Sequence, residues 1–291
     1  MKLICKIFSA LIIVSCISCN GIILSQQDKT LTDSLIIITR INDKTLMTSF
    51  GSDAVVFVRS DSSIVVIDAG ISTGLTNKYR KLAESEFGDI PFEYVINTHG
   101  HHDHYRGNNV FGEAKVIGHI NMGEEIDSQW KSPEKVAIQI KKIVEEYEAK
   151  LAKAVAGSDE WKDSYIGREK YSFSYKDAVN FLPVIKPGIT FSDSLNISVG
   201  DIDFEMIYFG KCHSKSDILI YVPQLNILFT GDLFSKYGRA DLNHENDKEN
   251  WNRSAEWINK RMFNINTVIG GHGQLLTKDD LESFIKTIKA K

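Results

Sequence analysis

The sequence has few cysteines and no excess of basic residues. Of its four cysteines, Cys5, Cys16 and Cys19 lie close to the N-terminus, so the body of the chain contains Cys212 alone. A single cysteine excludes an internal disulfide framework, and we expect Cys212 to be buried in the core, as unpaired cysteines usually are. The net charge of −4 gives no support to a nucleic-acid partner.

Repeats, low-complexity tracts and internal linkers rich in glycine or proline are also absent from the sequence. The length of 291 residues suffices for one large domain or two small ones, and 43% apolar with 25% charged residues is ordinary for a soluble globular protein. Because no linker requires a second domain, we predict one domain over residues 34–291.

The N-terminal segment has the pattern of a secretory leader. Lys2 and Lys6 flank the start of an apolar run, Ile7–Val14, that is too short for a stable membrane anchor. We predict a leader over residues 1–19, followed by a polar tether over residues 20–33.

Two cysteines are candidates for lipid attachment. The segment that ends at Cys16 resembles the bacterial lipobox, in which an acylated cysteine becomes the mature N-terminus, and Cys19 is a second candidate. A plain cleaved signal peptide is the alternative. Either way we expect an exported bacterial protein, periplasmic or held at the inner or outer membrane by an N-terminal lipid anchor.

The body of the chain alternates strand patterns with helix patterns, which favours an α/β layer architecture. The expected strands are 35–39, 54–58, 63–67, 92–97, 114–118, 189–191, 195–199, 203–209, 218–222, 227–229 and 267–269. The expected helices are 72–87, 254–263 and one that begins at residues 277–280 and continues through Ile288.

Residues 122–186 form a separate segment of helical character. Ser132 and Pro133 suit a helix start, apolar residues then recur at steps of three and four, and Gly157 can end that helix in a left-handed cap. We predict a helical insertion beside the mouth of the site. It either packs on the rest of the fold or acts as a lid whose aromatic residues contact substrate.

Four histidines and an aspartate follow directly after the expected strand 92–97. They are His99, His101, His102, Asp103 and His104. Imidazole nitrogens and carboxylate oxygens are ligands that zinc and related metals prefer, so this cluster predicts a metal site. Three more candidate ligands stand where later strands should end, namely His213, Asp232 and His272.

These motifs resemble those of the metallo-β-lactamase superfamily of binuclear hydrolases. The resemblance extends from about Leu35 to the C-terminus, and it includes residues 67–70 (Ile-Asp-Ala-Gly), which match the family's early aspartate motif. It implies a four-layer αββα sandwich with the metals at one edge, between the two sheets.

The resemblance also implies how the ligands are divided. His99, His101 and His213 would hold one zinc ion, Asp103, His104 and His272 the second, and Asp232 would bridge both. The division suits metal chemistry, because it leaves each ion an open position for water or substrate. Two divalent ions and two aspartates leave two positive charges (4 − 2), which should stabilise a bound hydroxide and attract a carbonyl or phosphoryl oxygen.

Two aspartates have further roles in this interpretation. Asp103 could carry a proton to the leaving group and is our candidate catalytic residue. Asp68 is either a turn residue or a carboxylate that steadies the histidine loop. We expect His102 to support the site or to be exposed, and we assign no role to His119 or His244.

Departures from the family pattern bear on the substrate. Asp232 stands where one group of the β-lactamases has cysteine. The lysine that holds substrate in that group is replaced by Ser235, and a lysine, Lys236, follows one position later in the chain. Arg106 introduces a side chain where the family usually has glycine. These residues permit β-lactam hydrolysis without indicating it.

We therefore expect an exported, zinc-dependent metallo-hydrolase with two Zn²⁺ ions. Its small-molecule substrate would be an ester, lactone, thioester, amide or phosphoester. The alternatives are a β-lactamase, an iron-dependent oxidoreductase of the persulfide dioxygenase type, and a metal-stabilised binding protein without turnover. Specificity depends on loops around the site, so the sequence leaves the substrate open.

Overall fold

The computed structural model describes residues 31–234 and 248–289. The chain divides into two compact units, Met1–Leu35 and Ile36–Lys291. In the first unit only residues 31–35 are described, and they are helical. The predicted leader, with Cys16 and Cys19, therefore lies outside the described residues.

The larger unit begins with a seven-stranded sheet whose strands lie in chain order. It consists of β1 (Ile37–Asn42), β2 (Thr45–Phe50), β3 (Asp53–Arg59), β4 (Ile64–Ile67), β5 (Phe92–Ile96), β6 (Lys115–His119) and β7 (Ile189–Phe191). Strands β1 to β4 pair antiparallel, whereas β4 to β7 pair parallel. The parallel pairs need crossovers, which the helices after β4 and β6 provide.

A six-stranded sheet follows, in the order β13-β12-β11-β10-β9-β8. Its strands are β8 (Ser194–Val199), β9 (Ile202–Tyr208), β10 (Ile218–Val222), β11 (Ile227–Gly231), β12 (Thr267–Gly270) and β13 (Leu275–Leu276). Within this sheet β11 and β12 pair parallel, so both strands end at the same edge. That edge carries two of the predicted ligands.

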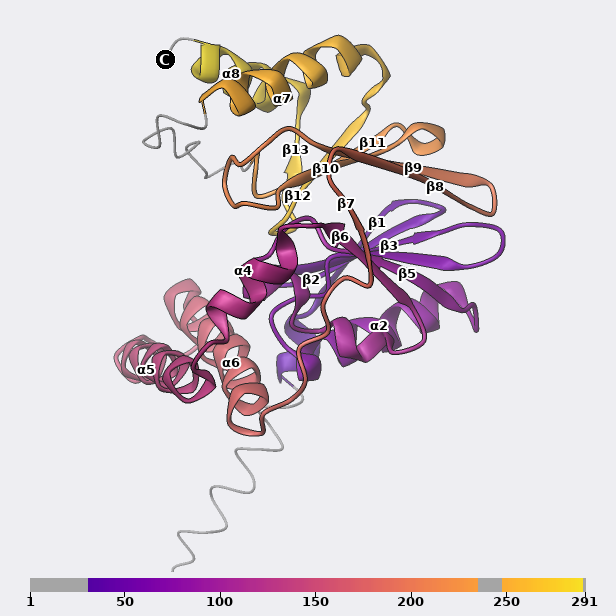
Figure 1. Ribbon diagram of the computed structural model, residues 1–291. Coiled ribbons are helices and arrows are strands. Elements are labelled where there is room, and N and C mark those ends of the chain that lie inside the picture. Colours follow the sequence, from indigo (N-terminus) through magenta and orange to yellow (C-terminus); the bar gives the residue numbers. More distant parts are fainter. Residues whose placement is uncertain (1–30, 235–247, 290–291) are drawn as a thin grey trace, which may run out of the picture. The chain divides into compact units, whose positions relative to one another are not determined.

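Helices cover the outer faces of the two sheets (Figure 1). Helix α2 (Thr73–Phe87) lies against the first sheet, while α7 (Lys248–Arg261) and α8 (Lys278–Lys289) cover the second. Short helices complete the set: α3 (His102–Tyr105), η1 (Asn108–Phe111), η2 (Pro223–Leu225) and η4 (Met262–Asn264). The expected αββα sandwich is confirmed.

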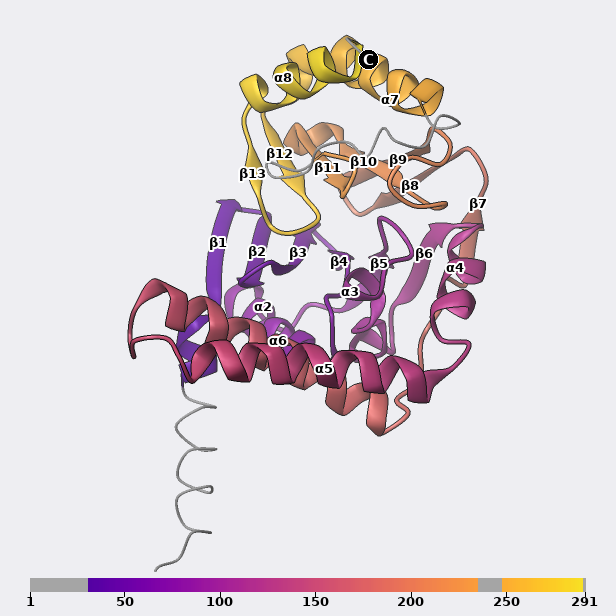
Figure 2. The same cartoon turned by 90° about the vertical axis from the view of Figure 1, so that its left-hand side faces the viewer.

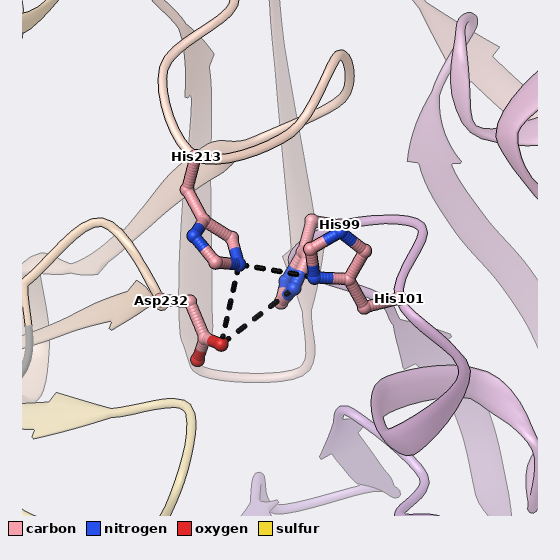
Figure 3. Close-up of side chains that lie close together, drawn as sticks. All are labelled: His99, His101, His213 and Asp232. Carbon is pink, nitrogen blue, oxygen red and sulfur yellow. Dashed lines mark hydrogen bonds and ion pairs between the residues drawn. The ribbon is translucent and has the colours of Figure 1, made fainter. Parts of the chain in front are cut away.

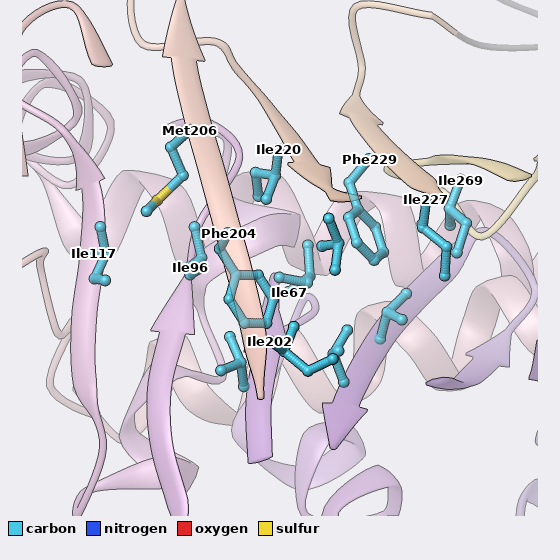
Figure 4. Packing of buried hydrophobic residues seen from close by; sticks show 14 of the residues in the cluster. Ile67, Ile96, Ile117, Ile202, Phe204, Met206, Ile220, Ile227, Phe229 and Ile269 are labelled. Carbon is cyan, nitrogen blue, oxygen red and sulfur yellow. The ribbon is translucent and has the colours of Figure 1, made fainter. Parts of the chain in front are cut away.

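The principal core lies between the sheets (Figure 4). Ile67 and Ile96 of the first sheet face Phe204 of the second across it. Strand β10 shows how the chain achieves this, because neighbouring residues of a strand point to opposite faces. Its residues 218, 220 and 222 enter the core between the sheets, whereas residues 219 and 221 pack under α7 and α8. A strand buried on both faces requires an unbroken apolar run, which residues 218–222 supply.

The predicted insertion forms α4 (Met122–Gln129), α5 (Pro133–Leu151) and α6 (Asp159–Val179), all between β6 and β7. Figures 1 and 2 show the three helices on one side of the sandwich. The expectation that the helix beginning at Pro133 continues to Gly157 is wrong. Helix α5 ends at Leu151, and Ser158 caps a new helix by accepting a hydrogen bond from the Trp161 amide. The chain reverses direction between the two helices, and residues 152–158 make that reversal.

Other elements also differ from the sequence expectation. Helix α7 spans Lys248–Arg261 where residues 254–263 were expected, and β13 was not predicted. The first strand begins at Ile37, and residues 31–35 before it are helical. Strand β2 was not predicted, because buried Thr45 and Thr48 interrupt its apolar pattern. Pairing with β1 and β3 on both sides supplies the missing stabilisation. None of the described helices is long and apolar enough to span a membrane.

A buried carboxyl group joins the first sheet to α2. Asp53, at the start of β3, accepts hydrogen bonds from the Ile71 amide at 2.8 Å and from the Tyr79 hydroxyl at 2.9 Å. Burial raises the pKa of Asp53 to about 6, although Lys170 and these hydrogen bonds oppose the increase. The folded protein therefore holds a proton at Asp53 that the unfolded chain releases near pH 4.

We expect Asp53→Asn to remove a pH dependence of stability. Between about pH 4 and pH 6 the unfolded state ionises while the folded state does not, so stability falls as pH rises, by roughly 3 kcal/mol in all. The unfolding free energy of each protein is measured by urea titration at each pH. The value for Asp53→Asn minus that for wild type should rise over this window and level off above it. Asp89→Asn, at an exposed position, is the control, and an equal trend there would contradict the assignment.

Candidate metal centre

The histidine loop begins where β5 ends, and buried polar residues fix its path. The Asn97 amide donates to the Ile117 carbonyl at 2.9 Å, and the Asn97 side chain donates to the His104 carbonyl at 3.0 Å. The loop then enters α3, which carries Asp103 and His104. The chain around the loop is thus held by bonds to the neighbouring strand and to itself.

Four of the predicted ligands meet in one group, His99, His101, His213 and Asp232 (Figure 3). The Nε2 atom of His213 lies 3.0 Å from His101 Nδ1 and 3.4 Å from Asp232 Oδ2. His99 Nε2 lies 3.9 Å from the same carboxylate oxygen. The loop after β5, the loop between β9 and β10, and the loop after β11 therefore direct these donor atoms to a common point.

The remaining three predicted ligands, Asp103, His104 and His272, form a second group. His104 Nε2 lies 3.9 Å from Asp103 Oδ1. Asp232 reaches this group as well, since its Oδ1 lies 3.7 Å from His104 Nε2 and its Oδ2 lies 3.1 Å from His272 Nε2. The structure thus brings all seven residues together, with Asp232 between the two groups.

The donor atoms fit metal ions better than they fit one another. His99 Nε2, His104 Nε2 and Asp232 Oδ1 are buried and have no hydrogen-bond partner among the described residues. Buried polar atoms are nearly always paired, because an unpaired one costs about 1–3 kcal/mol. Two metal ions, one at each group, would supply the missing partners of these nitrogen and carboxylate donors.

Gly271 keeps the space between the ligands open, a role that sequence reasoning did not identify. A Cβ atom at this position would lie 2.4 Å from Asp232 Oδ1 and 2.8 Å from His104 Cε1. Any side chain here would displace one of the two ligands. The Gly-Gly-His sequence before β13 was the available signal.

Asp68 supports the loop, as one of its two interpretations expected. Its Oδ1 accepts a hydrogen bond from the Thr98 amide at 2.7 Å, and its Oδ2 accepts from the Thr98 hydroxyl at 2.8 Å. The same Oδ2 lies 2.9 Å from His104 Nδ1. Holding the proton on Nδ1 leaves Nε2 of His104 as the free donor that faces the ligand group. Asp68 has a φ of 57°, so the turn after β4 is left-handed at this residue.

Helix α4 of the insertion also supports the loop, which the sequence did not indicate. The Lys215 amide donates to Glu125 Oε1 at 2.6 Å, and the Ser216 hydroxyl donates to Glu125 Oε2. Ser216 in turn accepts from the Gly100 amide at 2.9 Å. Glu125 thereby ties the His213 loop to the chain between His99 and His101. Only tertiary contact reveals this role, because Glu125 lies in an ordinary helical pattern.

Burial and mutual charge shift the pKa values of the ligands. Burial lowers the pKa of His99 well below its usual value, and it lowers that of His213 to about 4. Burial opposes ionisation of Asp103, but the nearby His104, His102 and His272 outweigh it and lower its pKa to about 2. The pKa values of His104 and His272 are raised instead, because the burial of His104 is outweighed by Asp68 beside it and Asp232 accepts a hydrogen bond from His272. Neutral histidines and ionised aspartates are the forms that bind metal, so these two histidines would release a proton on binding.

The other residues considered from the sequence lie outside the two groups. The side chain of His102 is 38% exposed, and its Nδ1 lies 3.9 Å from Asp103 Oδ1. His119 is buried and stacks on Tyr208 with ring centroids 3.7 Å apart. Cys212 is buried, as expected. Ser235, Lys236 and His244 lie outside the described residues.

We expect Asp68→Asn to weaken metal binding by about 10–100-fold. An amide cannot accept hydrogen bonds at both of its ends, so either Thr98 or His104 loses its partner. Zinc affinity, measured by competition with a chromogenic chelator, reports the loss. Asp53→Asn changes another buried aspartate and should keep wild-type affinity; unchanged affinity in Asp68→Asn would contradict the role of Asp68.

Comparison with known proteins gives short sequence matches and longer structural ones. Metallo-beta-lactamase type 2 from Bacillus cereus is 35% identical over 82 residues, which are 28% of this chain and 32% of that protein. The corresponding protein from Bacteroides fragilis is 27% identical over 94 residues, 32% of this chain and 37% of that protein. The matched part of the chain thus spans about a third of the length of these curated relatives.

Solved structures share the fold over most of the chain. A metallo-beta-lactamase from Pontibacter korlensis superposes with a TM-score of 0.56 at 16% identity, covering 88% of this chain and 100% of that one. The stereoselective inverting sec-alkylsulfatase Pisa1 from Pseudomonas sp. superposes with a TM-score of 0.62 at 16% identity, covering 86% of this chain and 40% of that one. At these identities the likeness shows the fold alone.

The family model described as the metallo-beta-lactamase superfamily matches residues 49–272. That span includes all seven residues of the two ligand groups. With the αββα sandwich and the site at its edge, the match shows that this chain belongs to the metallo-beta-lactamase superfamily.

Proposed function

We propose that this protein is a binuclear zinc hydrolase that cleaves an ester, lactone, thioester, amide or phosphoester. The observation that carries the proposal is the position of Asp232, whose carboxylate lies between two groups of donors. His99, His101 and His213 would hold one ion, Asp103, His104 and His272 the other, and Asp232 both. Such ions supply Lewis acidity and lower the pKa of water to near neutrality.

The residues of the site divide the remaining tasks. Asp232 and Asp103 supply negative charge to ions that carry more positive charge, so the centre keeps an excess that attracts a carbonyl or phosphoryl oxygen. The Asp103 side chain is 28% exposed and so can reach solvent and substrate. It accepts a proton from the attacking water and delivers it to the leaving group. Asp68 and Glu125 hold the two loops in place.

We expect the purified protein to contain about two zinc ions per chain and to hydrolyse at least one chromogenic substrate. The panel comprises nitrophenyl esters, thioesters, lactones, nitrophenyl phosphodiesters and nitrocefin. Asp103→Asn should lower kcat by about 10²–10⁴-fold or more, because it removes the proton carrier and also a carboxylate that would hold the second ion. His119→Gln, outside both groups, is the control variant.

Other results would redirect the proposal. One iron and no zinc per chain, with oxygen consumption, would favour the oxidoreductase. A second result is that the protein hydrolyses no activated substrate while cells that carry a folded His101→Ala variant keep the wild-type phenotype. That result would favour a metal-stabilised binding protein. Metal content by mass spectrometry separates the first outcome from the second.

A β-lactamase is the second candidate, because the curated relatives are named metallo-beta-lactamases. Nitrocefin hydrolysis that matches or exceeds that of every ester in the panel would favour it. Asp232 stands where one β-lactamase group has cysteine, so we place this candidate second.

We also propose export with lipid attachment at the N-terminus, supported by the charged and apolar pattern of residues 1–19. Expressed in a bacterium with labelled palmitate, the wild type should incorporate label. Cys16→Ser should abolish incorporation if Cys16 is the acylated residue, while Cys19→Ser should not. Incorporation lost only in Cys19→Ser would move the site to Cys19, and no incorporation in the wild type would leave a plain signal peptide.

A further inference from the structure

A cavity of about 280 Å³ lies in the helical insertion, next to the metal loop. Its walls come from the end of α4, one face of α5, α6, and the first residue of α3. The lining residues are His102, Gln129, Trp130, Val136, Gln139, Ile140, Ile143 and Tyr171. It is separate from the ligand groups, none of whose residues lines it.

The lining is mainly apolar and carries no permanent charge. Val136, Ile140 and Ile143 stand at steps of four and three along α5, so they share one face of that helix. Trp130 and Tyr171 add aromatic surface from α4 and α6. Because no lysine or arginine lines the cavity, it offers nothing to pair with an anionic group, and an apolar group suits it.

Contacts outside the cavity hold its walls in place. The buried guanidinium of Arg106 lies 4.5 Å from the centre of the Trp130 ring. It donates to the carbonyl oxygens of Leu182 and Pro183 after α6, and the Trp130 indole donates to the Tyr105 hydroxyl at 2.8 Å. Arg106 is the side chain that replaces the family's usual glycine, so this chain uses it to fix the insertion to the metal loop.

Helices α5 and α6 are also packed closely enough to keep the cavity's shape. A Cβ atom at Gly167 of α6 would lie 2.2 Å from the Tyr147 ring of α5. Tyr147 also stacks on Tyr171, with ring centroids 5.9 Å apart. The cavity is therefore built by specific contacts and formed before any ligand enters.

Two lining residues connect the cavity to the metal centre. His102 stands between His101 and Asp103, which belong to the two ligand groups. Gln129 donates through Nε2 to the carbonyl of Gly100 and accepts from the Tyr105 hydroxyl at 3.2 Å. His102 Nδ1 also lies 3.9 Å from Asp103 Oδ1, so a molecule in the cavity would contact a side chain that itself approaches one of the candidate ligands.

We propose that this cavity, named here the α5 pocket and defined by the lining residues above, binds the alkyl or acyl chain of the substrate while the scissile bond lies at the metal centre. The inference rests on the proposed hydrolase function. The volume lies just below the ~300–1,000 Å³ typical of sites for whole drug-sized ligands, so the pocket suits one arm of a substrate.

The test compares nitrophenyl esters of increasing chain length, from acetate through butyrate and hexanoate to decanoate, on the zinc-loaded full chain. In the wild type kcat/KM should rise about three- to fourfold per added methylene until the pocket is full. Ile143→Phe fills the pocket and should remove this increase, so that kcat/KM no longer depends on chain length. Val136→Phe tests the same prediction at a second wall position.

Ile138→Phe is the matched control, since Ile138 lies on the same helix, is 57% exposed and does not line the pocket. It should keep the wild-type chain-length profile. A flat profile in the wild type, or an increase that survives both Ile143→Phe and Val136→Phe, would overturn the proposal while leaving the hydrolase in place.

Calorimetric binding of octanol provides a readout besides activity. Octanol should bind the wild type and Ile138→Phe, fail to bind Ile143→Phe, and compete with decanoate ester hydrolysis. Octanol that binds without competing would overturn the proposal. If no ester is hydrolysed but octanol binding is lost in Ile143→Phe, the apolar pocket is supported and the esterase activity is not.

Discussion

The packing of the two sheets across a shared apolar core is the constraint on which the site depends. Ile67, Ile96 and Phe204 hold the sheets face to face, and the ends of β5, β11 and β12 then meet at one edge. Six of the seven candidate ligands follow those strand ends, and His213 lies in the loop between β9 and β10, which Glu125 holds in place. Binding sites built on strand ends are precise because the strands are rigid elements.

Bringing the candidate ligands together is electrostatically unfavourable, and the surrounding residues orient and support them. Two aspartates and five histidines converge at the site, and the donor atoms His99 Nε2, His104 Nε2 and Asp232 Oδ1 are buried without a hydrogen-bond partner among the described residues, which is unfavourable. Asp68 orients His104, Glu125 ties together two ligand loops, and Gly271 leaves room between Asp232 and His104. Replacing neighbours of this kind typically lowers metal affinity or activity by about 10–100-fold.

The insertion adds three helices, α4 to α6, to the sandwich. Only Ile140 of α5 is fully buried, so the helix contributes little to the core. Its apolar face lines the α5 pocket instead, and Arg106, buried against Trp130, fixes the insertion to the metal loop. The sequence left open whether the insertion packs or contacts substrate. The structure shows close packing of α5 on α6 with a cavity kept beside it.

The sequence by itself, through its pattern and its resemblance to the family, identified most strands and the seven donor residues that the structure brings together, because metal donors and buried strands each require particular residue types in a fixed pattern. The seven candidate ligands and the run 218–222 could be identified in this way. The tertiary structure alone decided the roles of Glu125, Gly271 and the pocket, and the existence of β2. Each of these depends on contacts between residues far apart in the chain, and a local sequence pattern does not reveal such contacts. Thr45 and Thr48, for example, are buried in a strand because β1 and β3 flank them.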